Sequence, residues 1–341
     1  MKYPIAVFII VAIIFLISCD NKHIQLEILS KEICRYGDVE GGGKGIVGNA
    51  NDFIKDINGN VYVLDGAFKK VIKYSNKGIY LKEYGKGEGP GPGEFYDPRS
   101  IDIDSLGNIY IADMLKRNIT VLDSLNNVVK IVKLNMMPAR IVVTKPFHVY
   151  VLGFPFSYKG DLIHKYVLTN DGLEIPSQTF CKRITGKDSL AIEKSGNIGS
   201  FIKGKNGSLY YGSPYPNEIR KFSESGELLS KFIFNPSNEY EPKINKNTNG
   251  IIVDMNMIFR DISFLNDSTM IRQVLIRNND VFKTSIDVID THSNRYIGTI
   301  ENGLIELDKS TTIKGDGMNN IFVYYREPVP IIKKYNIHIK R

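Results

Sequence analysis

Cysteine and histidine, which form many catalytic and metal centres, are scarce in this sequence. The 341 residues include only three Cys and five His, and the His residues (positions 23, 148, 164, 292 and 338) show no metal-ligand spacing. No Ser-His-Asp order or Glu pair stands out, and no GxxxxGK[S/T] loop is present. Residues 43–48 formally match GxGxxG, but no strand precedes them and no amphipathic helix follows. We therefore predict no cofactor and no metal site, and an enzyme is the less favoured interpretation.

Long runs of one charge are also missing. Lys and Arg number 44 against 37 Asp and Glu, which gives a formal net charge of +7. The basic residues are scattered, as in Lys69-Lys70 and Lys333-Lys334, and they form no stripe. Dispersed lysines on strand faces usually protect sheet edges from pairing. We therefore predict that the protein does not bind nucleic acid.

The one long apolar run lies at the N-terminus. Residues 5–17 follow Lys2 and form an unbroken apolar segment that has the length of a signal-peptide core and is shorter than a membrane span. The sequence LISC (16–19) resembles a bacterial lipobox, in which the Cys is acylated before cleavage. We expect residues 1–18 to be a lipoprotein signal peptide, residues 19–23 a tether lipidated at Cys19, and residues 24–341 the folded domain. The alternatives are an uncleaved anchor helix and secretion with Cys19 unmodified.

Two thiols then remain, those of Cys34 and Cys181. An exported location permits a disulfide, but the two residues lie in different repeats, so their spacing does not establish a pair. Two buried free thiols are the favoured interpretation.

What the sequence does contain is a repeated antiparallel pattern. The stretch GKGEGPGPGEFYDPRSIDIDSLGNIYIADMLKRNITVL (85–122) indicates a bend, then strand, tight turn, strand, turn and strand. A single such sheet cannot bury both of its faces, so it needs copies of itself beside it. The segment DSLGNIYIAD (104–113) is echoed by DINGNVYVLD (56–65), and looser versions occur at 145–151, 205–211, 266–272 and 317–323.

The spacing of these copies predicts six units. Their central residues are separated by 48, 40, 60, 61 and 51 residues, and the two longest gaps indicate loop insertions. A period of about 40–50 residues is typical of propeller repeats. We predict an all-β fold, a six-bladed β-propeller of four-stranded antiparallel blades. The central residues are Tyr62, Tyr110, Tyr150, Tyr210, Ile271 and Phe322.

These motifs resemble a known family. GxGxGPGEFxxP, IDIDSLGNIYIAD and RNITVLD are similar to an NHL-type propeller repeat, clearly so over about residues 52–132. With its N-terminus, the whole chain resembles the six-bladed β-propeller lipoproteins of Bacteroidota-type bacteria. The resemblance implies the fold and a lipid-anchored location in the bacterial cell envelope, with the outer membrane favoured and the periplasmic or surface side undecided. It implies little about activity, because propellers host many unrelated functions.

The two ends of the chain predict how the ring closes. Residues 24–28 alternate between apolar and polar and indicate a lone strand before the first unit, whereas the last unit, which ends with residues 331–339, stops one strand short. Unpaired sheet edges would otherwise face water. We predict that the N-terminal strand pairs with the C-terminal one and completes the last blade.

Recurrent polar residues in the repeats are expected to serve the fold. Asp65 and Asp113 end the central strands and are expected to tie down the following turn. Asn60 and Asn108 follow Gly in tight turns that favour positive φ. Ligand contact is the alternative for these residues.

A gap-free alignment of the six units gives a candidate ligand site. It projects residues 99–100 onto 51–52, 139–140, 199–200, 260–261 and 311–312, where each blade would begin its inner strand at the mouth of the central channel. Three Arg in this ring favour an anionic ligand. The favoured interpretation of these charges is nevertheless salt bridging between blades, for example Arg260 with Asp52 or Asp261, and ligand binding is the alternative. The candidate ligand-binding residues are Asn51, Asp52, Arg99, Arg140, Arg260 and Asp261.

The sequence is compatible with three functions. The favoured one is a membrane-anchored envelope lipoprotein, a monomeric ring that binds or organises a glycan, peptide or protein partner. One alternative is a metal-dependent hydrolase or lyase of the six-bladed propeller type. Asn51 and Asp52 could contribute to its metal site, and His148 and His164 could approach the same face, but three Arg would repel a cation. The other alternative is a purely structural subunit of an envelope complex.

Overall fold

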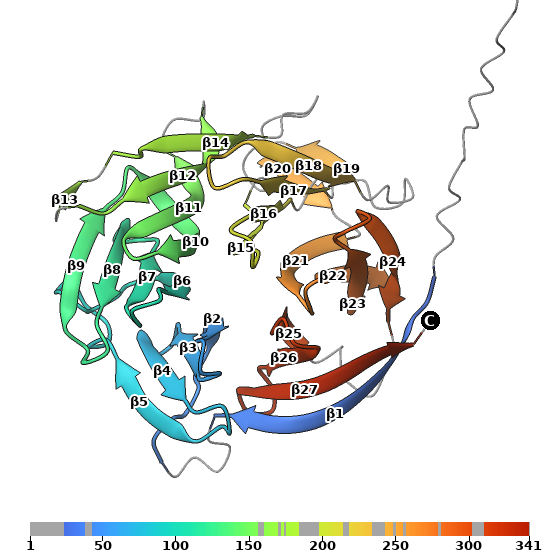
Figure 1. Cartoon of the computed structure of the whole chain (residues 1–341), viewed down its shortest axis with the longest axis horizontal. Coiled ribbons are helices and arrows are strands. Elements are labelled where there is room, and N and C mark those ends of the chain that lie inside the picture. Colours follow the sequence, from blue (N-terminus) through green and yellow to red (C-terminus); the bar gives the residue numbers. More distant parts are fainter. Residues whose placement is uncertain are drawn as a thin grey trace, which may run out of the picture.

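The strands of the chain form a ring of six sheets around a central channel (Figure 1). The computed structural model describes residues 24–37, 43–155, 160–169, 172–173, 175–183, 198–213, 218–233, 243–247, 250–254, 257–278, 281–301 and 310–340. The predicted signal peptide and tether, with Cys19, lie outside these residues. No helix in the described part of the chain is long and apolar enough to cross a membrane.

Each sheet is an antiparallel meander of four strands, which we call blades 1 to 6 in chain order. Blade 1 consists of β2 (Ala50–Lys55), β3 (Val61–Asp65), β4 (Lys70–Tyr74) and β5 (Tyr80–Tyr84). Blade 2 consists of β6 (Pro98–Ile103), β7 (Ile109–Asp113), β8 (Asn118–Leu122) and β9 (Val128–Lys133), with the short β13 (Gly172–Leu173) added parallel to β9. Blade 3 consists of β10 (Met136–Lys145), β11 (His148–Pro155), β12 (Asp161–Val167) and β14 (Gln178–Lys182).

The second half of the ring repeats this plan. Blade 4 consists of β15 (Ser200–Lys203), β16 (Leu209–Gly212), β17 (Glu218–Phe222) and β18 (Leu228–Ile233), and a separate hairpin of β19 (Lys243–Asn247) and β20 (Gly250–Asp254) follows it. Blade 5 consists of β21 (Met257–Phe264), β22 (Thr269–Asn278), β23 (Val281–Asp290) and β24 (Arg295–Ile300). Blade 6 consists of β25 (Ser310–Gly315), β26 (Asn320–Tyr325), β27 (Ile331–Lys340) and β1 (Glu27–Tyr36). The predicted six-bladed β-propeller is confirmed.

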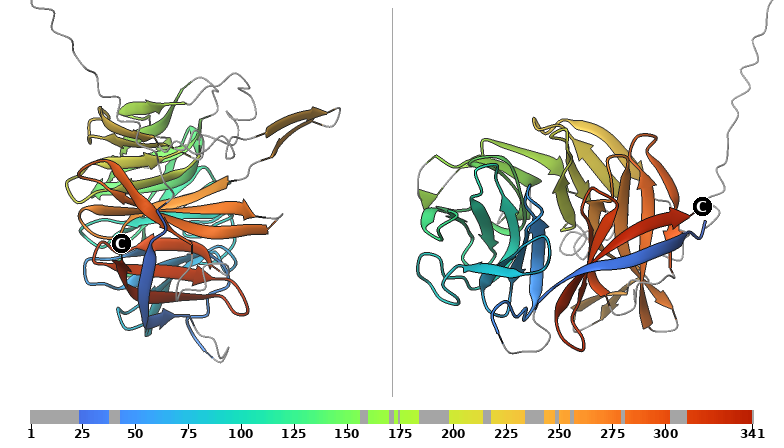
Figure 2. Two further views of the ribbon diagram at one scale, coloured as in Figure 1. Left: turned by 90° about the vertical axis from the view of Figure 1, so that its right-hand side faces the viewer. Right: turned by 60° about the horizontal axis from the view of Figure 1, so that its bottom comes forward.

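The two ends of the chain close the ring. β1 pairs antiparallel with β27, from Glu27 opposite Lys340 to Tyr36 opposite Ile332, and forms the outer strand of blade 6. Figure 2 (right) shows the two strands running side by side along the rim. The predicted pairing of the N-terminal and C-terminal strands is therefore confirmed.

The hydrophobic core lies between neighbouring blades. All six central residues of the repeats fall in the second strand of their blade, and each is at most 4% exposed. The strands β3 and β7 are buried at every position, because each blade packs against a neighbour on both of its faces. One apolar cluster joins strands of blades 1 and 2, and another joins blades 2 and 3. The repeat pattern thus encodes both the strands and their stacking.

The recurrent Asp residues hold the turns, as predicted. Oδ1 of Asp113 accepts the backbone N–H of Lys116 at 2.8 Å, and Oδ2 accepts that of Tyr96 at 2.7 Å. Asp65 makes the equivalent bonds in blade 1, to the N–H groups of Phe68 and Gly48. Both Asp residues are fully buried. They join the turn between the second and third strands to the loop that leads into the inner strand, which is a structural role.

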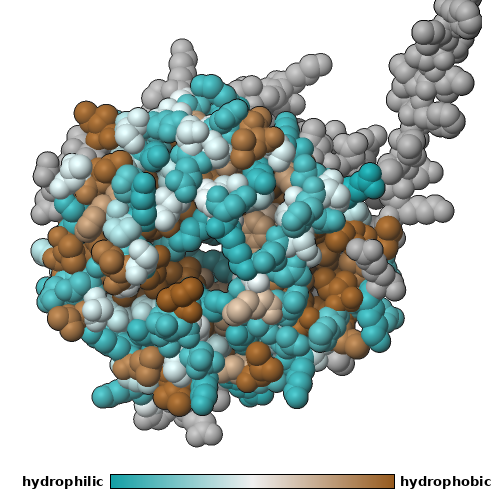
Figure 3. Space-filling model, viewed as in Figure 1, coloured by the Kyte–Doolittle hydropathy of each residue, from teal (hydrophilic) through white to brown (hydrophobic). Residues whose placement is uncertain are grey.

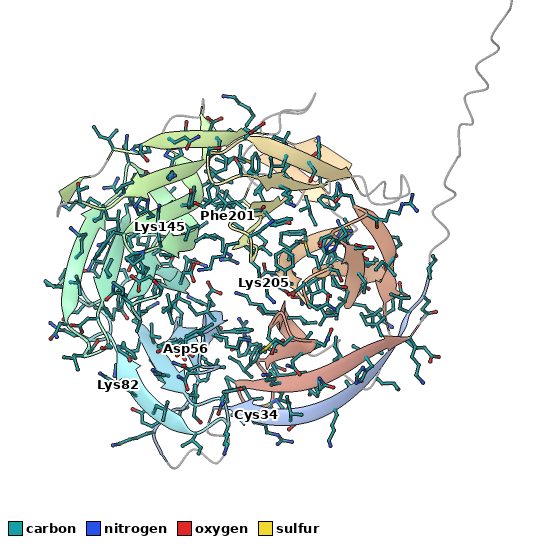
Figure 4. The ribbon with its side chains drawn as sticks, viewed as in Figure 1. Cys34, Asp56, Lys82, Lys145, Phe201 and Lys205 are labelled. Atoms are coloured by element: carbon teal, nitrogen blue, oxygen red, sulfur yellow. The ribbon has the colours of Figure 1, made fainter. Side chains whose placement is uncertain are left out.

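The ring has two distinct faces. We call the face where the inner strands begin the bulge face, and the face that holds the turns between the first and second strands the turn face. Figures 1, 3 and 4 look onto the turn face, and Figure 3 shows an opening at its centre. The β19–β20 hairpin projects away from the ring on the bulge side (Figure 2, left).

Candidate functional site

The inner strand of five blades contains a β-bulge at an equivalent position. In each of these strands the pairing with the second strand skips one residue near the start of the inner strand. A bulge bends a strand and re-aims the side chain of the extra residue. The skipped residues are Asn51, Arg99, Ala139, Arg260 and Thr311. They are the residues that the gap-free alignment placed together, so the alignment is in register.

The three Arg residues of this ring differ in their surroundings. The side chain of Arg99 is 47% exposed, and its Nε lies 2.8 Å from Oδ1 of Asp97. Arg140 is half-buried, and its Nη1 donates to the carbonyl of Ala139 at 3.1 Å. Arg260 is exposed and has no hydrogen-bond or ion-pair partner within the described residues. Two of the three guanidinium groups therefore face solvent at the bulge face.

Asn51 links blade 1 to blade 2. Its Nδ2 donates to the carbonyl of Pro98 at 2.7 Å, and its Oδ1 accepts from Nδ2 of Asn49 at 2.9 Å. A Cβ at Gly66 would come within 2.3 Å of Asn51 Nδ2, so a side chain there would displace the Asn51 amide. The amide of Asn51 is consequently engaged in holding the blades together.

Asp52 and Asp261 are buried, with 5% and 6% exposure. Asp52 Oδ2 accepts from Ser100 Oγ at 3.0 Å and from the N–H of Ile101 at 3.1 Å, both in blade 2. Asp261 of blade 5 accepts a short hydrogen bond from Ser200 Oγ in blade 4. These carboxylates therefore connect blades and do not project into the channel mouth.

The ammonium group of Lys314 supplies the positive charge that compensates these buried carboxylates. Its Nζ donates to Asp52 Oδ1 in a short contact and lies 3.9 Å from Asp261 Oδ2. Burial alone would raise the pKa of Asp52, but the charges of Lys314 and Arg140 outweigh this effect and lower it. The suggested pairing of Arg260 with these carboxylates is wrong, since Lys314 of blade 6 takes that place.

Lys314 was missed because the candidate ring stopped at residue 312. Two residues further along a strand, a side chain lies on the same side, and the aligned positions there include Asp102 and Ser263 as well as Lys314. Asp102 of blade 2 accepts from the N–H of Val143 at 2.7 Å, and Lys203 of blade 4 reaches it at 3.1 Å. A second layer of polar contacts thus joins the inner strands below the bulges.

Lysines also gather at the turn-face end of the channel. Nζ of Lys334 lies 3.2 Å and Nζ of Lys55 3.8 Å from Oδ2 of Asp316. Burial lowers the pKa of Lys55, Asp316 opposes this effect, and the positive charges of Lys334 and Lys205 add to it. Figure 4 shows Lys205 beside the central opening. A cavity of about 440 Å³ lies next to it, lined by Thr144, Lys203, Gly204, Lys205, Gly207 and Glu224.

The described His and Cys residues form no cluster at the channel mouth. His148 pairs with Val167 and His164 with Val151, so the two rings lie three residues apart along blade 3. Cys34 and Cys181 are free thiols, half-buried and buried respectively, and burial raises the pKa of Cys181 to about 12. The described residues contain no cluster of three or more His, Cys, Asp or Glu side chains that could hold a metal ion.

Comparison with known proteins supports the fold. The model of the DUF5128 family, described as a 6-bladed beta-propeller, matches residues 48–270. A member of the DUF4221 family from Bacteroides vulgatus has 9% sequence identity and a TM-score of 0.64, covering 94% of this chain and all of the other. A candidate exported protein from Bacteroides fragilis has 12% identity and a TM-score of 0.60, covering 94% and 98%.

An enzyme is among the structurally similar proteins. Virginiamycin B lyase from Staphylococcus aureus has 14% identity and a TM-score of 0.57, covering 92% of this chain and 99% of its own. Identities this low show a shared fold only. No curated protein matches the chain in sequence.

Proposed function

We propose that this chain, which belongs to the DUF5128 family of six-bladed β-propellers, is an envelope lipoprotein. In this proposal its bulge face binds an anionic group of a glycan, peptide or protein partner. The observation that carries this proposal is the contrast between buried and exposed charges near the bulges of the inner strands. Asp52 and Asp261 are buried and neutralised by Lys314, whereas Arg99 and Arg260 sit on bulges with their side chains exposed.

The chemistry of these Arg residues favours an anionic partner. A guanidinium group presents five N–H donors in a planar fork that fits a carboxylate or phosphate. Since Lys314 already serves the inter-blade carboxylates, neither exposed Arg is needed to hold the ring together. Both lie at the bulge of an inner strand, so they are held by a rigid scaffold.

The envelope location and the lipid anchor are part of the same proposal. The lipobox-like sequence that ends at Cys19 supports them, as does the structural similarity to a candidate exported protein. We expect mass spectrometry of protein purified from bacterial membranes to find Cys19 as the first residue, carrying acyl chains. An unacylated Cys19 would refute the tether without affecting the binding site.

A ligand-induced thermal shift tests the binding site. The chain would be screened with acidic oligosaccharides and acidic peptides, and the double variant Arg99→Ala, Arg260→Ala would be compared with Arg295→Ala, which removes an exposed Arg at the start of β24. We expect a compound that stabilises the unmodified chain and Arg295→Ala to lose its effect on the double variant. Equal stabilisation of all three proteins would remove Arg99 and Arg260 from the site. A stoichiometric divalent metal in the purified protein would favour the hydrolase or lyase alternative.

A further inference from the structure

Exposed apolar side chains gather on the turn face of blades 6, 1 and 2. Ile57 is 100% exposed, Leu106 71% and Met318 57%, and each lies at the tip of the turn between the first and second strands of its blade. Ile79 and Leu125, exposed by 62% and 74%, occupy the turns between the third and fourth strands of blades 1 and 2. We call these five residues the apolar tips. The corresponding inner turns of blades 4 and 5, residues 204–207 and 266–268, carry only polar residues and Gly.

The acidic groups of these turns accept hydrogen bonds from the backbone of the same turn. Asp56 Oδ1 accepts the N–H groups of Asn58 and Asn60 at 2.9 and 2.8 Å, and Asp104 makes the same bonds in blade 2. A carboxylate that is held by its own turn leaves the apolar residue as the outermost group. Figure 3 shows apolar side chains set among polar ones on this face, over the side where blades 1 and 2 lie.

Basic side chains accompany the apolar tips. Lys77 is exposed in the outer turn of blade 1, and Nζ of Lys82 donates to the carbonyl of Ser124, the residue before Leu125. Figure 4 shows Lys82 at the outer edge of this part of the ring and Lys205 at the channel. Apolar residues flanked by lysines on one face are the pattern by which proteins bind the surface of an anionic bilayer.

We propose that the turn face of blades 6, 1 and 2 rests on an anionic lipid surface, with the apolar tips inserted between the headgroups. Each tip belongs to a separate turn, so together they form no groove, whereas a stable protein interface needs a contiguous core. The orientation in this proposal rests on the lipid tether of the proposed function. Four residues separate Cys19 from Ile24, so the described chain would start within about 17 Å of the membrane. In this orientation the bulge face, with Arg99 and Arg260, points away from the bilayer.

Vesicle sedimentation of the unlipidated chain tests this inference separately from the tether. Residues 20–341 contain every described strand and lack Cys19. We expect this chain to sediment with vesicles of phosphatidylcholine and phosphatidylglycerol, and more weakly with phosphatidylcholine alone. The double variant Ile57→Asp, Leu106→Asp should bind about ten-fold more weakly or worse, because charged tips cannot enter the interface.

A matched control lies on the opposite face. Phe68 and Leu115, exposed by 48% and 63%, occupy the turns between the second and third strands of the same two blades. The variant Phe68→Asp, Leu115→Asp should bind vesicles as the unmodified chain does, and circular dichroism would verify that both variants are folded. No binding of the unmodified chain to anionic vesicles, or equal loss in both variants, would overturn the proposal. Self-association that is abolished by Ile57→Asp would instead make a second copy the occupant of this face.

Discussion

Replacing Lys314 by Met removes the cation that two buried carboxylates share. Lys314 Nζ contacts Asp52 and lies 3.9 Å from Asp261 Oδ2, and these Asp residues are only 5% and 6% exposed. Loss of one partner of a buried pair costs about 3–5 kcal/mol, because an uncompensated charge stays behind. The Lys314 side chain is 21% exposed, so water compensates in part. We therefore expect the free energy of unfolding at pH 7 to fall by about 3 kcal/mol.

The pH dependence distinguishes this mechanism from a simple loss of packing. In the unmodified protein the folded-state pKa of Asp52 is lowered, so its contribution to stability is present above the unfolded value, about 3.9, and is lost as the pH falls through the folded pKa. Without Lys314, the effect of burial is less opposed, and it raises the pKa of Asp52 in the folded variant. Protonation of Asp52 then removes the uncompensated charge. The difference in free energy of unfolding between the variant and the unmodified protein should therefore become smaller as the pH is lowered from 7 towards about 4.

Urea denaturation at a series of pH values measures both effects. Lys205→Met is the matched control, because Lys205 pairs with Asp267 at 73% and 71% exposure and such surface pairs contribute about 1 kcal/mol or less. The reasoning would be refuted if Lys314→Met cost no more than Lys205→Met, or if its deficit were the same at every pH.

Three further predictions concern the blades and their closure. Asp113→Asn should lower the free energy of unfolding by about 3 kcal/mol, because an amide cannot accept all the N–H groups that the buried carboxylate now holds; thermal unfolding would measure this. Gly78→Ala should cost about 2 kcal/mol in urea denaturation, because Gly78 has a φ of +80° and an added Cβ would lie 2.0 Å from the carbonyl oxygen of Arg35. Deletion of residues 24–36 should expose the edge of β27 and cause aggregation, which light scattering would detect.

The repeated strands could be predicted from sequence because they are local. The turn sequences DINGN and DSLGN each place Gly at a position that has positive φ in the structure, at Gly59 and Gly107, and the alternating apolar residues on either side fix the hairpin. The spacing of six such hairpins then gave the blade number, and the extra strand at the N-terminus gave the closure. Each of these predictions depends only on residues that are close in sequence, or on the number of strands and repeats.

The connections between blades could not be predicted in the same way. Lys314 and Asp52 are far apart in the sequence, and nothing in the local pattern of either residue identifies the other as its partner. Lys203 reaches past blade 3 to Asp102 for the same reason. Alignment of the repeats located the bulges correctly, but which side chains point into a neighbour and which into solvent depends on how the blades pack.

The closure of blade 6 by β1 also sets an order for the folding of the chain. β1 can pair with β27 only after residues 331–340 have been synthesised. A nascent chain that still lacks these residues therefore cannot complete blade 6 or close the ring. A truncated chain that lacks β27 leaves β1 and the outer edge of β26 unpaired. Such exposed edges favour aggregation and proteolysis.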